Sequence, residues 1–142
     1  MATVSATVIE QVITSLKAAE GLTLFPYNDM GDVSIGYGHN LTRRGISKAI
    51  AEQWLAEDIQ SVIADVESKL PWVSGLPPTA QQVIIEMAYQ LGIGGLLQFK
   101  QTLNALQNKQ WSAAATYMND SLWARQTPKR AQRLAGMLIA LN

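Results

Sequence analysis

The sequence predicts an α+β, mainly helical chain with a small strand-bearing lobe, a long connecting helix and a helical lobe. Apolar residues recur at helical spacing before residue 20 and through most of the chain after residue 47. Between these stretches, residues 22–39 alternate large apolar residues with serine and glycine, which is typical of short strands. A loop that contains Pro71, Pro77 and Pro78 then separates the long helix from shorter ones.

The first helix is indicated by apolar residues from Val8 to Ala19, and Gly21 is placed to end it. Strands should follow from Leu22 to His39, with the stretch Asp-Met-Gly-Asp at 29–32 as the turn between two of them.

Ser47 can cap a long helix that runs to about Leu70. After the proline-containing loop, Thr79 and Gln82 have the spacing of a capping box, which predicts the start of the next helix.

Glycines at 92, 94 and 95 should break that helix. Two shorter helices are expected over 101–109 and 111–119. Thr127 followed by Pro128 opens the last helix, since proline suits the first helical position.

The composition fits one soluble domain without a metal or cofactor. A chain of 142 residues can bury roughly 70% of its unfolded surface on folding. With one histidine and no cysteine, the sequence offers no zinc cluster and no disulfide. No stretch approaches the length of a membrane span, and the first twenty residues lack the apolar run of a signal peptide.

Charge is balanced overall but unevenly distributed. Residues 1–108 carry six basic and ten acidic side chains, whereas residues 109–142 carry five basic and one acidic. The basic part could face a polyanion such as nucleic acid or a cell-wall polymer, and the excess is too small to choose between them.

Two carboxylates are the candidates for acid/base chemistry. Glu20 lies at the predicted C-terminal end of the first helix, where the negative end of the helix dipole disfavours an ionised carboxylate. A general acid needs a protonated carboxyl group, although an ordinary exposed glutamate fits the same position. Asp29 begins the turn, where local hydrogen bonding alone would favour aspartate.

The strand after the turn strengthens the case for a site. Alternation points Val33, Ile35 and Tyr37 to one side and Ser34, with glycines 36 and 38, to the other. A face of serine and glycine packs poorly as core but lets a ligand approach the backbone closely.

These motifs resemble the active-site hairpin of the phage T4-type lysozymes, glycoside hydrolase family 24. That family has a helix-terminal Glu-Gly, then Tyr-x-Asp, a turn, and Thr-Ile-Gly-x-Gly-His. The corresponding residues here are Glu20-Gly21, Tyr27-Asn28-Asp29 and Ser34-Ile35-Gly36-Tyr37-Gly38-His39. Residues 121–133 resemble the family's Trp-x-x-Gln-Thr-Pro-x-Arg-Ala-x-Arg element, and residues 87–92 with Phe99 match between the two motifs.

The resemblance implies a single lysozyme-like, two-lobed catalytic domain over residues 1–142. The small lobe would span about 20–47 and the linking helix about 48–70. The helical lobe would comprise 71–142 together with 1–19. A monomer that binds a peptidoglycan glycan strand, and neither nucleic acid nor a membrane, is the corresponding expectation.

The resemblance also implies roles for matching residues. Glu20 would protonate the leaving glycosidic oxygen, and Asp29 would activate a water with the help of Ser34, which stands where the family has threonine. Gln90 would line the cleft and contact sugar, and Tyr37 and Gly36 of the hairpin would lie against the substrate.

Three further residues would support that site. Arg130 matches the family arginine that pairs with the catalytic glutamate. His39 would pair with Asp58 on the long helix and tie the hairpin to it, a structural role that we favour over catalysis.

Two departures from the family pattern stand out. Four residues separate Asp29 from Ser34 where the usual spacing is five, so the turn is shorter by one residue. Ala19 stands where a close relative has an acidic residue, so Arg133 is expected to lack its usual partner.

The sequence therefore predicts an inverting muramidase, used as a phage endolysin that is made in the bacterial cytoplasm and reaches the wall through a holin-type pore. Two alternatives stay open. A lytic transglycosylase would also use a glutamate acid but would not need Asp29 as a base. A non-catalytic, wall-binding virion module would need none of the three residues Glu20, Asp29 and Ser34.

Overall fold

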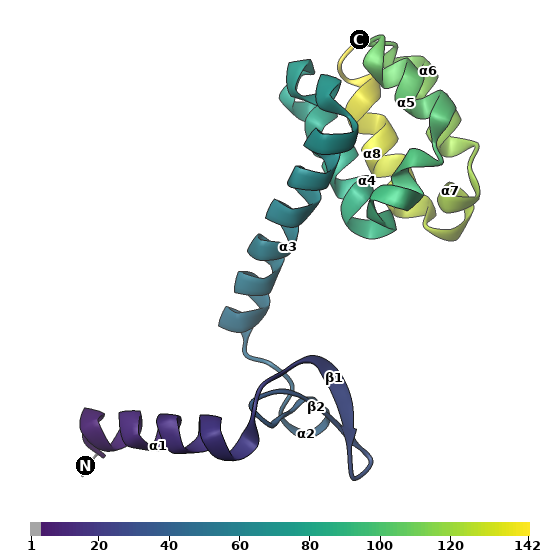
Figure 1. The fold of residues 1–142 in the computed structure, drawn as a ribbon. Helices are drawn as coiled ribbons and strands as arrows, with labels where there is room; N and C mark the ends of the chain where they lie inside the picture. Colours follow the sequence, from purple (N-terminus) through teal and green to yellow (C-terminus); the bar gives the residue numbers. More distant parts are fainter. Residues whose placement is uncertain (1–3) are drawn as a thin grey trace. The chain divides into compact units, whose positions relative to one another are not determined.

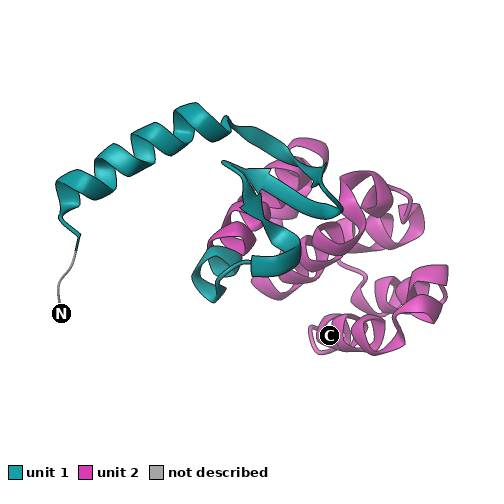
Figure 2. Cartoon of the chain, turned by 90° about the horizontal axis from the view of Figure 1, so that it is seen from below, with its two compact units in different colours: residues 1–52 teal, residues 53–142 magenta. Residues whose placement is uncertain are grey.

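The computed structural model describes residues 4–142 and confirms a mainly helical α+β chain. Helices and a small antiparallel sheet follow one another in the order labelled in Figure 1. The chain divides into two compact units, residues 1–52 and residues 53–142, which Figure 2 distinguishes by colour. Each unit is described by itself below.

The first unit opens with helix α1, Ala6–Glu20. Ser5 caps it, because its Oγ accepts a hydrogen bond of 3.3 Å from the backbone N–H of Val8. Gly21 ends the helix as predicted, with a φ of 70° that glycine adopts without the steric cost of a Cβ. Glu20 is consequently the last helical residue.

Three antiparallel strands follow in the order β1-β2-β3. They are β1 (Thr23–Asp29), β2 (Asp32–Gly36) and β3 (His39–Asn40). The register pairs Asp29 with Asp32 and Tyr27 with Ser34 across the hairpin.

A two-residue turn, Met30-Gly31, joins β1 to β2. Both residues have positive φ, 53° for Met30 and 91° for Gly31, as a type I′ hairpin turn requires. The side chain of Asn28 steadies the turn by accepting a hydrogen bond of 2.9 Å from the Gly31 N–H. The turn that the sequence shortens by one residue is therefore a regular tight hairpin.

Helix α2 (Leu41–Arg44) was not predicted from the sequence. At four residues it is too short for helical periodicity to mark it. Asn40 caps it, since its Oδ1 accepts from the Arg43 N–H at 2.9 Å, and Gly45 follows it with a φ of 56°.

The long helix α3 (Lys48–Lys69) begins after Ser47, whose Oγ accepts from the Ile50 N–H at 3.1 Å as predicted. A 3-10 helix, η1 (Pro71–Gly75), occupies the proline-containing loop.

The predicted capping box at Thr79 is wrong. Helix α4 (Pro78–Leu97) begins one residue earlier, with Pro78 in its first turn and no side-chain cap. Because Pro78 is already a helical residue, Thr79 lies inside the first turn and cannot act as the N-cap of a capping box. The glycine break is confirmed in part, because Gly92 leaves helical geometry (φ 72°, ψ 162°) and kinks α4 before the chain turns helical again.

Four shorter helices complete the second unit: α5 (Lys100–Gln107), α6 (Trp111–Asn119), α7 (Leu122–Gln126) and α8 (Pro128–Ile139). Only the five-residue α7 was not predicted. The apolar core of the unit lies between α4, α5, α6 and α8. Its fully buried side chains include Ile84, Met87, Leu106, Met118, Leu134 and Leu138.

Within residues 4–142, no helix combines the length and the apolar composition needed to cross a bilayer.

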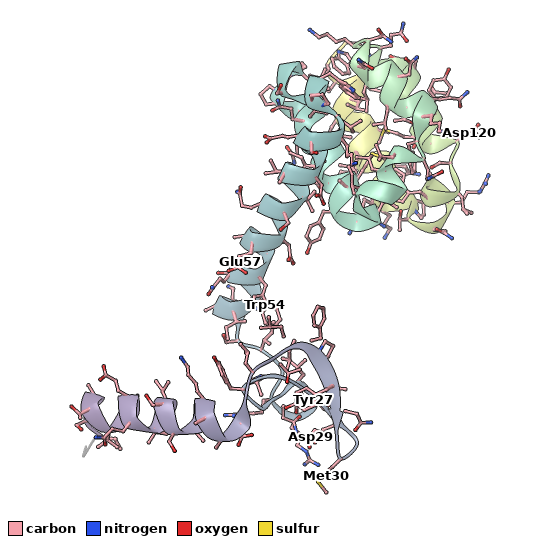
Figure 3. All side chains as sticks on the ribbon, in the orientation of Figure 1. Tyr27, Asp29, Met30, Trp54, Glu57 and Asp120 are labelled. Atoms are coloured by element: carbon pink, nitrogen blue, oxygen red, sulfur yellow. The ribbon has the colours of Figure 1, made fainter. Side chains whose placement is uncertain are left out.

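The turn residue Met30 offers a test of the hairpin geometry. Met30 is 100% exposed at the hairpin tip, so replacing it removes no packing (Figure 3). Met30→Asn should raise the free energy of unfolding by up to about 1 kcal/mol, because asparagine tolerates positive φ better than methionine. Urea denaturation of the variant would measure the gain. Met30→Ala keeps the strain and should leave stability unchanged, and an equal gain in both variants would contradict a positive φ at this residue.

Candidate active site

The side chain of Glu20 lies against Gly38, in the short connection between β2 and β3 of the first unit. A Cβ built on Gly38 would stand only 2.9 Å from Oε2 of Glu20 and 3.4 Å from its Cδ. Real Cβ atoms essentially never come that close, so a side chain at position 38 would require the carboxyl group of Glu20 to move. The helix end and the hairpin therefore meet at these two residues.

Asp29 and Ser34 lie on the two strands of that hairpin. Asp29 is the last residue of β1 and is exposed next to the turn, as Figure 3 shows. Ser34 lies in the middle of β2, paired with Tyr27 on one side and Asn40 on the other. Helix end, turn and central strand thus bring the three predicted catalytic residues into one compact unit.

Ser34 differs from the open serine-glycine face that the sequence predicts. It is fully buried, and its Oγ has no hydrogen-bond partner among the described residues. A buried hydroxyl without a partner costs free energy, so its presence calls for an explanation. The neighbouring small residue Gly36 fits the prediction better, since a Cβ built there would meet nothing within 4 Å.

Tyr37 follows β2 and is 44% exposed. The ammonium group of Lys17, from α1, lies 5.6 Å from the centre of its ring, within cation–π range. This contact joins α1 to the hairpin and covers one face of the Tyr37 ring.

His39 hydrogen-bonds within the first unit. Its Nε2 lies 2.6 Å from the carbonyl oxygen of Gly45, and because a carbonyl only accepts, Nε2 carries the proton. Its predicted partner Asp58 belongs to α3 in the second unit. The Nδ1 atom can serve a second partner, and the pair of His39 with Asp58 stays a prediction.

Gln90 belongs to a small network in the second unit. Its Oε1 accepts a hydrogen bond of 2.9 Å from the indole N–H of Trp123. The Trp123 ring packs edge to face on Phe99, with 5.9 Å between the ring centres. The network fixes the orientation of the Gln90 amide and leaves its NH₂ group for another acceptor.

Arg133, which was expected to lack its usual partner because Ala19 is uncharged, pairs with a different carboxylate. Its Nη2 donates to Oε1 of Glu86 at 2.8 Å, which joins α8 to α4. This bond, more than any other contact, lowers the pKa of Glu86, and it raises the pKa of Arg133. No local pattern around Arg133 indicates this carboxylate, which lies 47 residues earlier in the chain.

Arg130 is exposed on the same face of α8. With Arg133 and Glu86 it lines a pocket of about 610 Å³ in the second unit, whose other walls are mainly apolar side chains of α3 and α4. Its predicted partner Glu20 belongs to the first unit, so that pairing also stays a prediction.

The hairpin is also held in place by hydrogen bonds of residues that were not predicted to have a functional role. Asp32, paired with Asp29 in the register, accepts hydrogen bonds from Asn40 and Arg43. The sequence showed Asp32 only as a turn residue, and no periodic signal connects it to a four-residue helix. Within residues 4–142, no group of three metal-ligating side chains comes together.

A family model described as phage lysozyme matches residues 17–138. The matched range includes Glu20, Asp29 and Ser34, and also the network of Gln90 and Trp123.

Several known proteins are similar to the chain. Two proteins of Dictyostelium discoideum, named "Probable T4-type lysozyme 1" and "Probable T4-type lysozyme 2", are each 27% identical to it. The first alignment covers 92% of this chain and 94% of that protein, and the second covers 84% and 88%. "Peptidoglycan hydrolase gp36" of Pseudomonas phage phiKMV is 30% identical over 75% of this chain but only 12% of its own length.

Gly38 gives a test of the contact with Glu20. Gly38→Ala should cost roughly 1–2 kcal/mol from its φ of 74° and should also displace the carboxyl group. We expect wall-lysing activity to fall further than the loss of stability explains. Gly45→Ala is the matched control, because its φ is 56° and nothing lies within 4 Å of the built Cβ. Activity assays at a temperature where both variants are folded would decide, and equal activities would contradict the contact.

The ion pair of Glu86 with Arg133 should make stability depend on pH. Because the pKa of Glu86 is lowered below its usual 4.5, the pair stabilises the fold above that pH. The contribution should fade as pH falls through the lowered pKa. Glu86→Gln should therefore lower the melting temperature slightly at pH 7 and hardly at all at pH 3.

Calorimetry at both pH values would measure this difference. Glu67→Gln removes the same charge from a residue without an ion pair in the described part of the chain and serves as control. A destabilisation by Glu86→Gln of equal size at pH 7 and pH 3 would show that the charge of Glu86 is not its cause.

Proposed function

Because the chain belongs to the phage lysozyme family, we propose that it is a muramidase that hydrolyses the β-1,4 bond between N-acetylmuramic acid and N-acetylglucosamine in peptidoglycan. The named relatives, two T4-type lysozymes and a peptidoglycan hydrolase, support this substrate class.

Glu20 acts as the general acid in this proposal. It donates its proton to the glycosidic oxygen while the bond from that oxygen to the anomeric carbon breaks, and the bonding electrons leave with the oxygen. The position of Glu20 against Gly38 supports the role, since the hairpin backbone limits where the carboxyl group can go.

Asp29 acts as the base in the same single displacement. It accepts a proton from a water, whose oxygen bonds to the anomeric carbon on the face opposite the leaving group, so the configuration inverts. Such a mechanism needs ~6.5–9.5 Å between the two carboxyl groups, against ~5–5.5 Å for a covalent one.

The buried hydroxyl of Ser34 is the observation that carries the proposal. The Ser34 Oγ has no partner among the described residues, and in the proposal it makes its hydrogen bond to the attacking water. Ser34 faces no evident structural need for a hydroxyl, because alanine would fill nearly the same space without an unpaired polar atom. Holding the attacking water beside Asp29 gives this hydroxyl a purpose.

Other predicted residues complete the proposed site. Gln90 would contact sugar through its NH₂ group, since its Oε1 is bonded to Trp123. Gly36 and Tyr37 would lie along the substrate strand. Arg130 would pair with Glu20, and His39 with Asp58, to support the catalytic groups.

We infer phage-driven lysis as the biological setting, with the enzyme released from the host cytoplasm through a holin-type pore and acting as a monomer. A virion-associated setting is the second candidate. It is favoured by a 27% identity to a segment of "Pre-baseplate central spike protein Gp5" of Enterobacteria phage T4, although the alignment covers only 27% of that protein.

Product analysis on purified peptidoglycan tests the activity directly. Mass spectrometry should find reducing muramic acid ends, whereas an anhydro sugar would indicate a lytic transglycosylase and no cleavage a binding module. Proton NMR of fresh product should show the α anomer, and the β anomer would overturn inversion.

Substitution of Glu20 tests the proposed acid. Glu20→Gln keeps the shape of the side chain but removes its proton, so the rate should fall at least ~10²-fold. Thermal stability should stay level or rise. More than a tenth of wild-type activity would exclude Glu20 as the general acid.

Substitution of Ser34 tests the proposed water site, with opposite signs for activity and stability. Ser34→Ala should lose one hydrogen bond to the attacking water, ~1–3 kcal/mol or about 10- to 150-fold in rate. Removing an unpaired buried hydroxyl should leave the melting temperature unchanged or higher. A variant that lost stability and kept activity would show that the hydroxyl serves the fold.

A further inference from the structure

A closed ring of three hydrogen bonds lies beside the turn of the hairpin. Asn40 Nδ2 donates to Asp32 Oδ2 at 2.9 Å, and Arg43 Nε donates to the same oxygen at 2.5 Å. The backbone N–H of Arg43 donates in turn to Oδ1 of Asn40 at 2.9 Å. We call Asp32, Asn40 and Arg43 the hairpin clamp.

The clamp connects the strand that carries Ser34 to the helix that follows the sheet. Asp32 begins β2, Asn40 ends β3, and Arg43 lies in α2. A fourth bond runs parallel to it, from the Val33 N–H to Oγ1 of Thr42 at 2.8 Å. Three hydrogen bonds thus fix the start of β2 to residues 40–43, and a further one, from Arg43 to Asn40, holds those residues to each other.

The register places the clamp next to both hairpin residues of the proposed site. Asp32 is the cross-strand partner of Asp29, and Asn40 is the cross-strand partner of Ser34. A displacement of β2 against α2 would therefore move the backbone opposite Asp29 and the backbone beside Ser34 together.

Apart from the strand pairing, few buried side chains hold the hairpin within the first unit. Among residues 4–52 only Ser34 is buried, and the turn itself consists of two exposed residues. Hydrogen bonds with a charged partner are about twice as strong as neutral ones, so a clamp built on a carboxylate is an effective restraint. The pKa of Asp32 is lowered by its hydrogen bonds, first to Asn40 and then to Arg43, which keeps this carboxylate ionised.

We propose that Asp32 and Arg43 are positioning residues for the catalytic hairpin, which hold Asp29 and Ser34 in the geometry for water attack. The inference rests on the proposed function of Asp29 and Ser34. A misplacement of about 1 Å can cost up to ~10²-fold in rate, so breaking the clamp should lower turnover without removing any reacting group.

Steady-state kinetics on soluble peptidoglycan fragments test the clamp in the full chain. Asp32→Asn and Arg43→Ala should each lower kcat by roughly 10-fold with little change in KM, because the substrate contacts stay in place. The Arg43 side chain is 76% exposed, so this variant should fold even if a change at Asp32 does not. Wild-type kcat in Arg43→Ala would overturn the proposal.

Glu52→Gln is the matched control for charge. It removes one negative charge from another ion pair, Lys48 with Glu52 at 3.8 Å, without touching the hairpin. Its kcat should equal that of the wild type, and a loss equal to that in Asp32→Asn would assign the effect to net charge and overturn the clamp.

A double-mutant cycle shows whether the two residues act as one unit. The combined variant with Asp32→Asn and Arg43→Ala should lose no more kcat than either single change, because the ring is already open. Multiplying losses would contradict the clamp.

Asp29→Asn, measured in parallel, separates the two proposals. If Asp29→Asn keeps wild-type activity, the proposed function of Asp29 fails. If Asp29→Asn is inactive while both clamp variants keep wild-type kcat, the proposed function stands and the clamp fails.

Discussion

The pairing of β1 with β2 is the constraint on which the candidate site depends. Side chains alternate along a strand, so a slip of one residue would turn every side chain to the opposite face. The two-residue turn at Met30-Gly31 sets the register and places Asp32 opposite Asp29 and Ser34 opposite Tyr27. The shorter turn relative to the family pattern therefore alters the connection, while the pairs next to it keep a continuous antiparallel register as far as Tyr27 and Ser34.

Two local features then define the candidate site around these paired strands. The carboxyl group of Glu20 lies where a Cβ on residue 38 would come within 2.9 Å of it, so its present position depends on the glycine. The buried hydroxyl of Ser34 has no hydrogen-bond partner within residues 4–142. Both features reduce stability or tolerance to substitution, and strained or unsatisfied groups of this kind cluster where proteins carry out chemistry.

The sequence predicted the regular elements well, because their signals are local. Gly21 ends α1, Ser47 caps α3 and Pro128 opens α8 as expected. The short helices α2 and α7 were not predicted, because four or five residues are too few to show helical periodicity. Contacts between residues far apart in the sequence could not be predicted either. Nothing in the sequence around Arg133 indicates that its partner is Glu86.

The ring of Asp32, Asn40 and Arg43 has a consequence for how the chain can diverge. Each member donates to or accepts from both others, so replacing one leaves two polar groups without their partners. Evolutionary change at these positions should therefore be concerted. Among homologues that share the two-residue turn, we expect the amino acids at positions 32, 40 and 43 to change together. The exposed residue at the tip of the hairpin should vary independently of them.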